Sequence, residues 1–391
     1  MSTSATTHDA FASCQPGLES LVAAELSALG AAPRPLAGGV AFAADATMIM
    51  RAAHWLGCAS HVLVRLAEFP CRALGELERK AARLPWSDWL RRDVPLAMRA
   101  TTKGSRVYHT DAVVERVGNA ITAALGPMPR ATAGGEAGDA DHDPDDRAQL
   151  MVRFRNDVCA ISLDATTTPL HRRGYRLAAA KAPLREDLAH ALVLASGFED
   201  GQALLDPFCG SGTIAIEAAA LAAGLAPGRL RPPPLLHTAL FDADAWQQVL
   251  QLGRAARSNA PIAAADRDAG AIEMARANAE RAGVGDKIEF SCTAFSAHPW
   301  LQPNGAPGRG VVVTNPPFGR RVARDNSLLH LYQSLGHRID ELGAGWRATL
   351  LAHDVRLARR TGLELSVAFT TKHGGLSVTA LGTGAGEAAA A

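Results

Sequence analysis

Apolar positions in the C-terminal half of the chain fall into short runs separated by stretches of helical spacing. The short runs are typical of buried strands, and the longer stretches place apolar residues on one face of a helix. The predicted strands are residues 203–205, 262–265, 287–291, 310–315, 348–352, 365–370 and 377–381. The predicted helices between them are residues 214–223, 269–282 and 327–342. Repeated strand–helix units form a parallel sheet covered by helices on both faces, and the last two strands form an antiparallel pair that closes it.

The N-terminal half shows a shorter alternation, which predicts a small α+β region. Its predicted strands are residues 11–14, 40–42, 62–69 and 95–101. Its predicted helices are residues 18–29, 48–55, 74–84, 86–90 and 110–125. Two further apolar runs, residues 150–154 and 158–163, flank Asn156 and Asp157, and this arrangement predicts a β-hairpin.

Two segments connect or interrupt these regions. Pro183 stands at the start of a predicted helix with apolar residues at Leu184, Leu188 and Leu192, and this helix is expected to pack ahead of the second sheet. Residues 225–261 are first rich in proline and then helical, so they interrupt the strand–helix alternation. We expect this segment to cover one edge of the ligand site.

The composition is that of a globular protein of two or three domains, with 391 residues, 48% hydrophobic and 20% charged, and a net charge of +1. The six cysteines show no Cys-x-x-Cys spacing, which argues against a zinc site and a disulfide framework and fits a reducing cytoplasm. The N-terminus lacks the basic and apolar regions of a signal peptide, and no apolar run reaches the ~20 residues needed to span a bilayer. We therefore expect a cytoplasmic protein with no membrane or metal ligand, and the sequence gives no sign of an obligate protein partner.

Charge is distributed unevenly along the chain. Residues 133–146 contain six acidic residues and no Lys or Arg, a composition typical of a flexible surface insertion. This segment lacks the glycine and the closing glutamate of an EF-hand loop, which argues against a metal site. Residues 147–185 carry eight basic residues against two acidic ones. A basic stripe between two domains favours contact with a polyanion, and pairing with the acidic insertion is the alternative.

A glycine-rich turn at residues 204–213, Leu-Leu-Asp-Pro-Phe-Cys-Gly-Ser-Gly-Thr, joins a predicted strand to a predicted helix. Strand, acidic residue, glycine turn and helix are together typical of the opening unit of a nucleotide-binding α/β domain. Gly210 and Gly212 allow positive φ and a close approach of the backbone to a ligand, and the helix offers free N–H groups at its start. The turn lacks the Gly-Lys-Ser/Thr ending of a phosphate loop and the third glycine of a dinucleotide motif, so the turn alone leaves its ligand open.

A second motif lies further along the chain at residues 311–319, Val-Val-Val-Thr-Asn-Pro-Pro-Phe-Gly. Here an apolar strand runs directly into Asn-Pro-Pro and an aromatic residue. Together, the two motifs resemble those of class I S-adenosylmethionine-dependent methyltransferases that act on exocyclic amino groups of nucleobases. Methyl transfer to an amine is an in-line displacement with a neutral thioether as the leaving group, so it requires alignment and exclusion of water rather than strong acid–base groups.

The resemblance assigns the donor, S-adenosyl-L-methionine, to the glycine turn and to the ends of the next two strands. The turn is expected to hold the methionine half of the donor. The carboxylate of Asp266, at the end of a strand, can accept hydrogen bonds from the ribose hydroxyls, and Asp268 is expected to cap the following helix. Related enzymes often have an acidic residue after the third strand to contact adenine, but this chain has Thr293, so Thr293 or a backbone amide is expected to serve. The expected cofactor-binding residues are Asp206, Phe208, Cys209, Gly210, Ser211, Gly212, Thr213, Asp266 and Thr293.

The second motif is assigned to the acceptor base, with Asn315, Pro316 and Phe318 as the catalytic residues. A purine amine is planar and weakly nucleophilic because its lone pair is delocalised into the ring. The Asn315 side-chain oxygen and the Pro316 carbonyl can accept both N–H bonds, which favours a tetrahedral nitrogen, and the prolines leave no competing donor. Phe318 is expected to stack on the target base, with core packing as the alternative. Arg320 and Arg321 follow directly and are expected to hold the phosphate backbone.

Nearly the full length resembles one family, the bacterial RNA guanine-N2 methyltransferases that contain a THUMP domain, among them the RlmL-like and TrmN-like enzymes. The matching stretches are FASCQPGLESLVAAEL, LVRLAEFP, SRVYHTDAV, HRRGYR, KAPLRE, DPFCGSGTIAIEAA, EMARANAERAGV, TNPPFGRR and TKHGGLSVTALG. The THUMP resemblance implies RNA contacts from Lys103, Arg106 and His109, with a solvated loop as the alternative. The basic segment adds Arg172 and Arg173 to the expected RNA-binding residues.

The resemblance implies an α/β fold in which residues 169–391 form a class I, Rossmann-like methyltransferase domain with a seven-stranded sheet. A ferredoxin-like region at residues 1–64 and a THUMP domain at residues 65–168, with the acidic insertion at residues 133–146, are expected to precede it. The predicted activity is methylation of the N2 amine of a guanosine in structured RNA, either rRNA or tRNA, and the choice of guanine N2 depends on the resemblance alone. A DNA adenine-N6 methyltransferase shares both motifs, and a non-catalytic RNA-binding protein is the other alternative.

Overall fold

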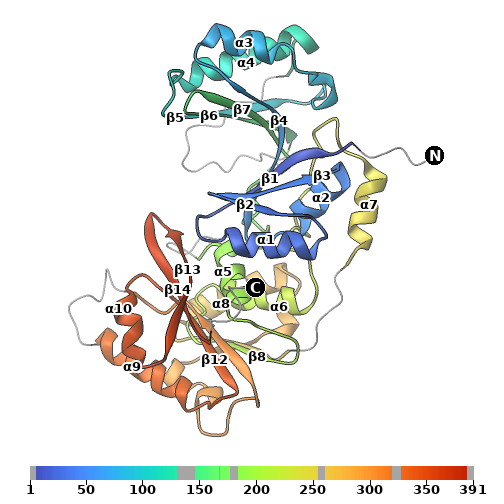
Figure 1. The fold of residues 1–391 in the computed structure, drawn as a ribbon. Helices are drawn as coiled ribbons and strands as arrows, with labels where there is room; N and C mark the ends of the chain where they lie inside the picture. Colours follow the sequence, from blue (N-terminus) through green and yellow to red (C-terminus); the bar gives the residue numbers. More distant parts are fainter. Residues whose placement is uncertain are drawn as a thin grey trace. The chain divides into compact units, whose positions relative to one another are not determined.

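The computed structural model describes residues 6–129, 146–166, 168–176, 184–253, 260–318 and 327–384. These residues form two compact units (Figure 1). The first unit comprises the described parts of Met1–Ser13, Glu25–Leu170 and Arg231–Leu252, and the second comprises those of Cys14–Ala24, His171–Leu230 and Gly253–Ala391. Among the described helices, none is long and apolar enough to cross a membrane.

The strands described for the first unit form a seven-stranded sheet in the order β2-β3-β1-β4-β7-β6-β5. They are β1 (His8–Cys14), β2 (Arg34–Leu36), β3 (Gly39–Ala44), β4 (Ala59–Pro70), β5 (Leu96–Lys103), β6 (Ala148–Arg155) and β7 (Val158–Asp164). The helices between them in the chain are α1 (Glu19–Ala28), α2 (Ala46–Trp55), α3 (Leu74–Ala81) and α4 (Thr110–Leu125), with a 3₁₀ turn at Trp86–Asp88. The predicted α+β alternation is confirmed. The hydrophobic pattern missed β2 because all three of its residues are exposed.

Strands β6 and β7 form the hairpin predicted around Asn156 and Asp157. Both residues have positive φ, 50° for Asn156 and 63° for Asp157. A two-residue turn with left-handed backbone at both positions matches the twist of the strands, and Asn and Asp adopt this conformation more readily than other non-glycine residues. The Asp157 carboxylate accepts the Arg106 backbone N–H at 2.8 Å, which ties the hairpin to the loop before α4.

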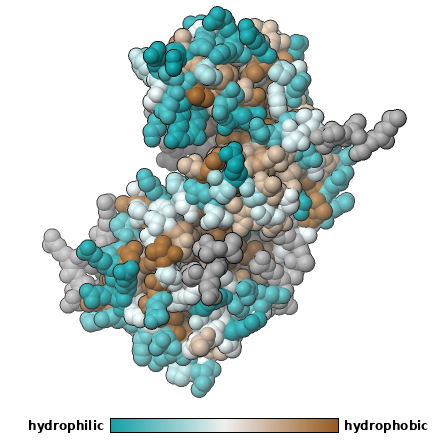
Figure 2. Space-filling model, viewed as in Figure 1, coloured by the Kyte–Doolittle hydropathy of each residue, from teal (hydrophilic) through white to brown (hydrophobic). Residues whose placement is uncertain are grey.

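The sheet formed by β5, β6 and β7 has one buried and one partly exposed face. Leu150, Val152 and Phe154 of β6 are buried, and α4 packs on β5. Arg153 and Arg155 point to the opposite face and are exposed. This alternation is expected of an antiparallel hairpin with only one face in the core. Figure 2 shows that the outer surface over α3 and α4 is mostly hydrophilic.

Residues Arg231–Leu252 pack in the first unit, although the strands before and after them in the sequence belong to the second. Helix α7 (Ala243–Gln251) packs on α2, and the Leu235 N–H donates to the Ala165 carbonyl at 2.9 Å. None of the described members of residues 225–261 lines the cavity described below, so their expected position over an edge of the ligand site stays a prediction. The proline-rich start of this segment has no periodicity that indicates where it packs.

The strands described for the second unit form a seven-stranded sheet in the order β10-β9-β8-β11-β12-β14-β13. They are β8 (Ala203–Asp206), β9 (Ile262–Asp266), β10 (Glu289–Cys292), β11 (Gly310–Thr314), β12 (Trp346–Ala352), β13 (Leu365–His373) and β14 (Leu376–Thr383). The helices are α5 (Glu186–Ala195), α6 (Thr213–Ala222), α8 (Ala269–Arg281), α9 (Ser327–Asp340) and α10 (Val355–Ala358), with 3₁₀ turns at Gly285–Lys287, Phe295–Ala297, Pro299–Leu301 and Arg359–Thr361. Strands β8 to β12 are parallel, and β14 is antiparallel to β12 and β13. The predicted Rossmann-like sheet with an antiparallel end is confirmed.

The parallel strands are buried on both faces, which explains their continuous apolar runs. Helix α9 covers one face, where Leu335 and Ile339 pack with Leu205, Val312 and Leu350 in one hydrophobic cluster. Helices α5, α6 and α8 pack together beside β8 and β9 (Figure 1). Every residue of α6 is buried, so the position of the glycine turn that precedes α6 is fixed by the core.

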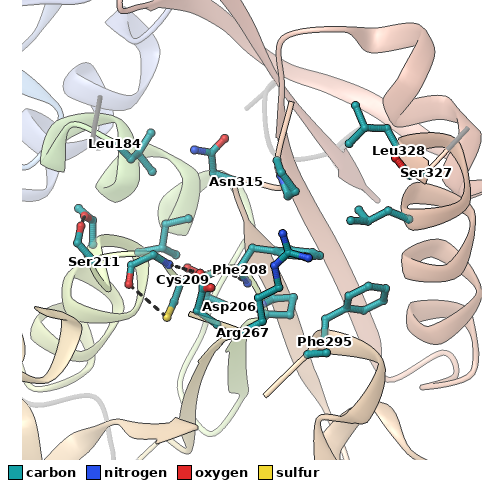
Figure 3. A pocket seen from close by; sticks show the side chains of 18 residues that line it. Leu184, Asp206, Phe208, Cys209, Ser211, Arg267, Phe295, Asn315, Ser327 and Leu328 are labelled. Atoms are coloured by element: carbon teal, nitrogen blue, oxygen red, sulfur yellow. Dashed lines mark hydrogen bonds between the residues drawn. The ribbon is translucent and has the colours of Figure 1, made fainter. Parts of the chain in front are cut away.

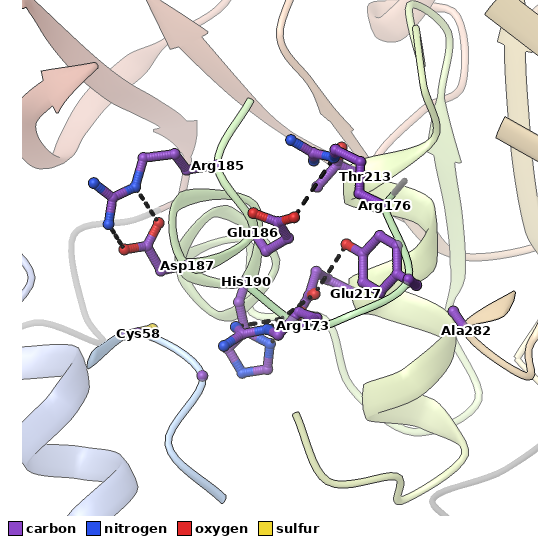
Figure 4. A network of polar contacts seen from close by, with 12 residues as sticks. Cys58, Arg173, Arg176, Arg185, Glu186, Asp187, His190, Thr213, Glu217 and Ala282 are labelled. Carbon is purple, nitrogen blue, oxygen red and sulfur yellow. Dashed lines mark hydrogen bonds and ion pairs between the residues drawn. The ribbon is translucent and has the colours of Figure 1, made fainter. Parts of the chain in front are cut away.

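Glu217 of α6 lies at the centre of a buried polar network (Figure 4). Its carboxylate accepts a hydrogen bond from Arg173 at 3.3 Å and one from the Tyr175 hydroxyl at 3.2 Å, and it pairs with His190 at 3.0 Å. Burial alone would raise the pKa of Glu217, but the Arg173 guanidinium and His190 outweigh burial and lower this pKa to about 2. Arg173 is only 2% exposed, so the prediction that it contacts RNA is wrong. Its side chain turns inward because Glu217 is its partner.

We expect Glu217→Gln to lower the free energy of unfolding by about 3 kcal/mol, because the substitution removes the carboxylate charge that pairs with the buried Arg173 and His190. Urea unfolding followed by circular dichroism measures this change. The matched control is Glu273→Gln on the exposed side of α8, which should change the unfolding free energy by less than about 0.5 kcal/mol. Equal, small changes in both variants would contradict a stabilising role for the network.

Candidate active site

A cavity of about 560 Å³ lies at the carboxyl ends of β8, β9 and β11 (Figure 3). From β8 the chain adds β9 and β10 on one side of the sheet and then crosses to β11 on the other side. The direction of winding therefore reverses between β8 and β11. Open α/β sheets bind their ligands at this kind of switch point, beyond the carboxyl ends of the strands.

The glycine turn forms the wall of the cavity between β8 and α6. The Cys209 N–H donates to the Ala265 carbonyl at 2.9 Å, which holds the turn against the end of β9. Gly212 has a φ of 82°, and a Cβ at this position would lie 3.0 Å from the Ala275 Cβ of α8. Both the backbone conformation and the close approach of α8 therefore require glycine at this position. Gly210 also has positive φ, 51°, but a Cβ there would have open space around it.

Two carboxylates lie in the wall of the cavity. Asp206 is 1% exposed, and its Oδ1 accepts the Thr314 hydroxyl at 2.7 Å and the Phe208 N–H at 3.3 Å. Asp266 accepts the Gly210 N–H at 3.0 Å on one oxygen and the Asp268 N–H at 3.0 Å on the other. A carboxylate has about four lone-pair positions, so Asp266 keeps acceptor capacity for a ligand after these two bonds.

The pKa of Asp206 is raised from 3.8 to about 7. Burial is the largest cause, and the negative charge of nearby Asp266 acts in the same direction. The hydrogen bonds from Thr314 and from the Phe208 N–H favour the ionised form and oppose the rise. The carboxyl group of Asp206 therefore changes its charge in the neutral pH range.

Asn315 follows β11 directly and lines the same cavity. Its side-chain oxygen, Oδ1, is buried and has no hydrogen-bond partner among the residues that the structure describes. A buried acceptor without a partner costs about 1–3 kcal/mol, so a donor group of a ligand is expected to satisfy it. Pro316 next to it is buried, and Pro317 lines the cavity.

Most of the predicted donor residues lie together in this cavity. Those that line it are Asp206, Phe208, Cys209, Gly210, Ser211, Thr213 and Asp266. Gly212 shapes the turn without lining the cavity. Thr293 does not line it either. Its backbone N–H donates to the Asp266 carbonyl at 2.9 Å, and its hydroxyl donates to the Ala294 carbonyl at 3.5 Å. The prediction that Thr293 contacts adenine therefore has no support in the geometry.

The motif that begins with Asn315 divides between cavity and surface. Phe318 is 36% exposed and does not line the cavity. Its ring stacks on that of His353 with centroids 5.8 Å apart and an interplanar angle of 10°. The alternative of core packing for Phe318 is therefore excluded. Arg320 and Arg321 lie outside the described residues.

The predicted RNA-binding residues of the first unit are all at the surface. Lys103, Arg106 and His109 are exposed. Arg106 also forms an ion pair with Asp157, with 3.9 Å between Nε and Oδ2. In the second unit Arg172 is exposed, in contrast to its buried neighbour Arg173.

The cavity also contains residues that sequence reasoning missed. Arg267 follows Asp266 directly and lines the cavity, and Phe295 lies two residues beyond Thr293. The ring centroids of Phe295 and Phe208 are 5.2 Å apart, and Figure 3 shows both residues at the cavity. One indication for Arg267 was present in the sequence, which is that it directly follows the aspartate at the end of a predicted strand. In the parts of the chain that the structure covers, no group of three or more His, Cys, Asp or Glu residues is arranged to hold a metal ion.

The raised pKa of Asp206 predicts a pH-dependent stability. Between the unfolded pKa of about 4 and the folded pKa of about 7, the folded protein binds a proton that the unfolded chain releases. The stability from this group is complete below the lower value and is lost as pH rises through the upper one. Asp206→Asn cannot ionise, so its unfolding free energy should gain a few kcal/mol relative to the wild type between about pH 5 and pH 8. Calorimetric melting at both pH values measures this gain, and a difference that does not change with pH would contradict the assigned pKa.

Comparisons with known proteins agree with this geometry. Residues 173–381 match the family described as RMKL-like, methyltransferase domain, and residues 9–63 match the RlmL ferredoxin-like domain. The chain is 32% identical to the protein named "Putative RNA methyltransferase slr0064" from Synechocystis sp., with 97% of each chain covered. It is also 32% identical to the ribosomal RNA large subunit methyltransferase K/L of Syntrophotalea carbinolica. That match covers 94% of this chain and 52% of the relative, so the chain spans about half the length of this relative.

Several solved structures are similar over nearly the full length. A possible methylase from Clostridium difficile 630 has a TM-score of 0.83 and 28% identity, covering 97% of this chain and 98% of that chain. The structure of a "predicted N6-adenine-specific DNA methylase" from Listeria monocytogenes has a TM-score of 0.80 and 28% identity, covering 96% of each chain. TrmN from Thermus thermophilus has a TM-score of 0.70 and 25% identity, covering 96% of this chain and 99% of that chain. With the family match over more than half of its length, the chain belongs to the family of RMKL-like methyltransferases, with a ferredoxin-like domain near its N-terminus.

Proposed function

We propose that this protein transfers a methyl group from S-adenosyl-L-methionine to the exocyclic N2 amine of a guanosine in structured RNA. The observation that carries the proposal is the buried Oδ1 of Asn315, which lies in the cavity at the switch point of the sheet and has no hydrogen-bond partner among the described residues. The N–H group of an amine can donate the hydrogen bond that this oxygen is free to accept. Family membership supplies the reaction class, and the names of the relatives supply RNA as the substrate class.

The residues of the cavity fit the donor. The turn that contains Gly210 provides a backbone wall with open space where a Cβ would stand, and Asp266 has lone pairs left for the ribose hydroxyls. Arg267 and Phe295 line the cavity and are suited to the faces of the adenine ring, in place of Thr293. When bound, the donor supplies an electrophilic methyl group on a sulfonium centre, and its leaving group is a neutral thioether.

Asn315 and Pro316 have separate tasks toward the acceptor amine. The Asn315 oxygen accepts one N–H bond of the amine, and the carbonyl of Pro316 is expected to accept the other. Both bonds orient the amine and draw its nitrogen away from the plane of the base, which frees the lone pair for attack. Because the leaving group is neutral, the amine can attack the methyl group without first losing a proton to a strong base.

The surface of the first unit favours a polyanionic substrate. Strands β5 and β6 are parallel neighbours, with Thr101 opposite Arg153 and Lys103 opposite Arg155. Lys103, Arg153 and Arg155 are exposed, and Arg99 on β5 is exposed as well. Four exposed basic side chains on two neighbouring strands suit contact with phosphate groups.

We assign this RNA-binding role to a THUMP domain at residues 65–168. Strand β4 spans the proposed boundary between residues 64 and 65, with a shift in its register to β7 between Arg65 and Ala67, so the ferredoxin-like region and this domain share one sheet. The methyltransferase domain is proposed to begin at residue 169. The sequence resemblance supports guanine N2 as the target atom. The name of the Listeria relative favours adenine N6 of DNA as the second candidate.

A pair of variants separates catalysis from donor binding. Asn315→Ala is expected to lower methyl transfer to RNA by about a hundred- to a thousandfold, comparable to the loss of a preorganised catalytic hydrogen-bond partner. Its affinity for S-adenosylmethionine should stay within twofold of the wild type, because Asn315 contacts the acceptor. Labelled-methyl transfer and equilibrium dialysis of the donor measure the two quantities. Unchanged turnover in Asn315→Ala would refute the assignment.

Asp266→Asn is expected to show the opposite profile. Loss of the charged acceptor should weaken donor binding by about tenfold or more, the effect of one hydrogen bond to a charged group. The matched control is Asp268→Asn, two residues further on, because Asp268 caps α8 by accepting the Gly270 and Ala271 N–H groups. Equal donor affinities in Asp266→Asn and Asp268→Asn would exclude the ribose role of Asp266.

A further inference from the structure

Two aromatic rings stack on each other at the carboxyl ends of neighbouring strands. Phe318 lies four residues after the end of β11, and His353 follows the last residue of β12. Strands β11 and β12 are parallel, and Thr314 is opposite Leu350, so both strands end on the same side of the sheet. The two ring centroids are 5.8 Å apart, and the ring planes are within 10° of parallel.

Neither ring belongs to the hydrophobic core. Phe318 is 36% exposed and is one of the few large apolar side chains at the described surface, and His353 is exposed as well. Neither residue lines the donor cavity, although Asn315 and Pro317, which precede Phe318 closely in the chain, do line it. The ring pair therefore lies outside the donor cavity, at the end of the chain segment that carries the unpartnered Asn315 oxygen.

A pair of parallel, exposed rings suits a planar aromatic ligand. A nucleobase that leaves its stack loses contacts on both faces, and an aromatic side chain replaces part of them. One exposed ring can rotate about its side-chain bonds, and a second ring stacked on one face restricts that rotation. Preorganisation of this kind reduces the entropy lost when the ligand binds. Because the imidazole occupies one face of Phe318, a base that stacks on this partly exposed ring would use the opposite face.

We propose that His353 is a positioning residue for the target nucleobase, acting by stacking on Phe318. His353 holds the Phe318 ring, the base stacks on the opposite face of that ring, and the exocyclic amine of the base then reaches the Asn315 oxygen. The proposal rests on the proposed function, since it concerns the same acceptor base. It adds a residue from a different strand to the acceptor side of the site.

The test compares three substitutions of His353 in the full-length protein. His353→Ala removes the ring, His353→Gln keeps a polar planar group without aromatic character, and His353→Phe keeps a ring without the imidazole nitrogens. The substrate is the RNA fraction that the wild-type protein methylates, taken from cells that lack the gene. The measurements are kcat and KM for RNA, the donor dissociation constant and the melting temperature. His337→Ala, an exposed histidine on α9, is the matched control.

The ring pair should affect the position of the base and leave the bulk of RNA binding intact. We expect His353→Ala and His353→Gln to lower kcat about tenfold, in the range of one base–aromatic stack. The KM for RNA, the donor dissociation constant and the melting temperature should stay close to wild-type values. His353→Phe should restore kcat to within about threefold of the wild type, while His337→Ala should leave kcat unchanged.

Two results would overturn the proposal while leaving the proposed function in place. In the first, the wild type methylates RNA and His353→Ala has the same kcat. In the second, His353→Phe fails as severely as His353→Ala, which would show that the ring is not the required feature. A wild-type protein that methylates no RNA fraction would overturn both the proposed function and this inference.

Discussion

The hydrogen bond between the Thr314 hydroxyl and the Asp206 carboxyl group connects the two sequence motifs that form the cavity. Its length is 2.7 Å, and it connects residues 108 positions apart in the sequence at the carboxyl ends of β8 and β11. The glycine turn follows Asp206, and the Asn-Pro-Pro motif follows Thr314. Because the carboxyl group is almost fully buried, this bond also satisfies a polar group that would otherwise be costly in the core. The relative position of the two motifs is thus fixed by the strands that carry them.

Buried ion pairs stabilise the core beside the cavity in addition to apolar packing. Glu217 lies within α6 and pairs with Arg173 and His190, so the helix that starts at the glycine turn is anchored to α5 and to the segment before it. The same segment supplies Arg176, which donates to the Thr213 hydroxyl at 2.7 Å in the cavity wall. Part of the basic segment that follows the acidic insertion therefore stabilises the donor site itself.

Periodicity predicted most of the strands and helices, and the resemblance of the two motifs to nucleobase methyltransferases predicted the main cavity residues. The pattern predicted α4 at both of its ends, and Asp206, Asp266 and Asn315 were found because each stands where an apolar run stops. The pattern could not tell Arg172 from Arg173, since adjacent arginines carry the same charge and only the fold decides which one meets Glu217.

Other site residues lay beyond sequence reasoning for a geometric reason. The loop after β10 turns so that Phe295 lines the cavity in place of Thr293, and no local pattern indicates that turn. His353 is a single histidine after a strand, and only the pairing of β11 with β12 brings it beside Phe318. Contacts between separate strands depend on register, which apolar periodicity alone does not specify.

Under the proposed function, the cavity and the Asn315 motif together methylate a guanine amine in RNA. The most direct measurement is transfer of labelled methyl from S-adenosylmethionine into separated rRNA, tRNA and DNA from cells that lack the gene, followed by mass spectrometry of the nucleosides. The proposed function predicts N2-methylguanosine in an RNA fraction, and the labelled fraction would also distinguish rRNA from tRNA. Label confined to DNA as N6-methyladenine, or no transfer to any of the three nucleic acids, would contradict it.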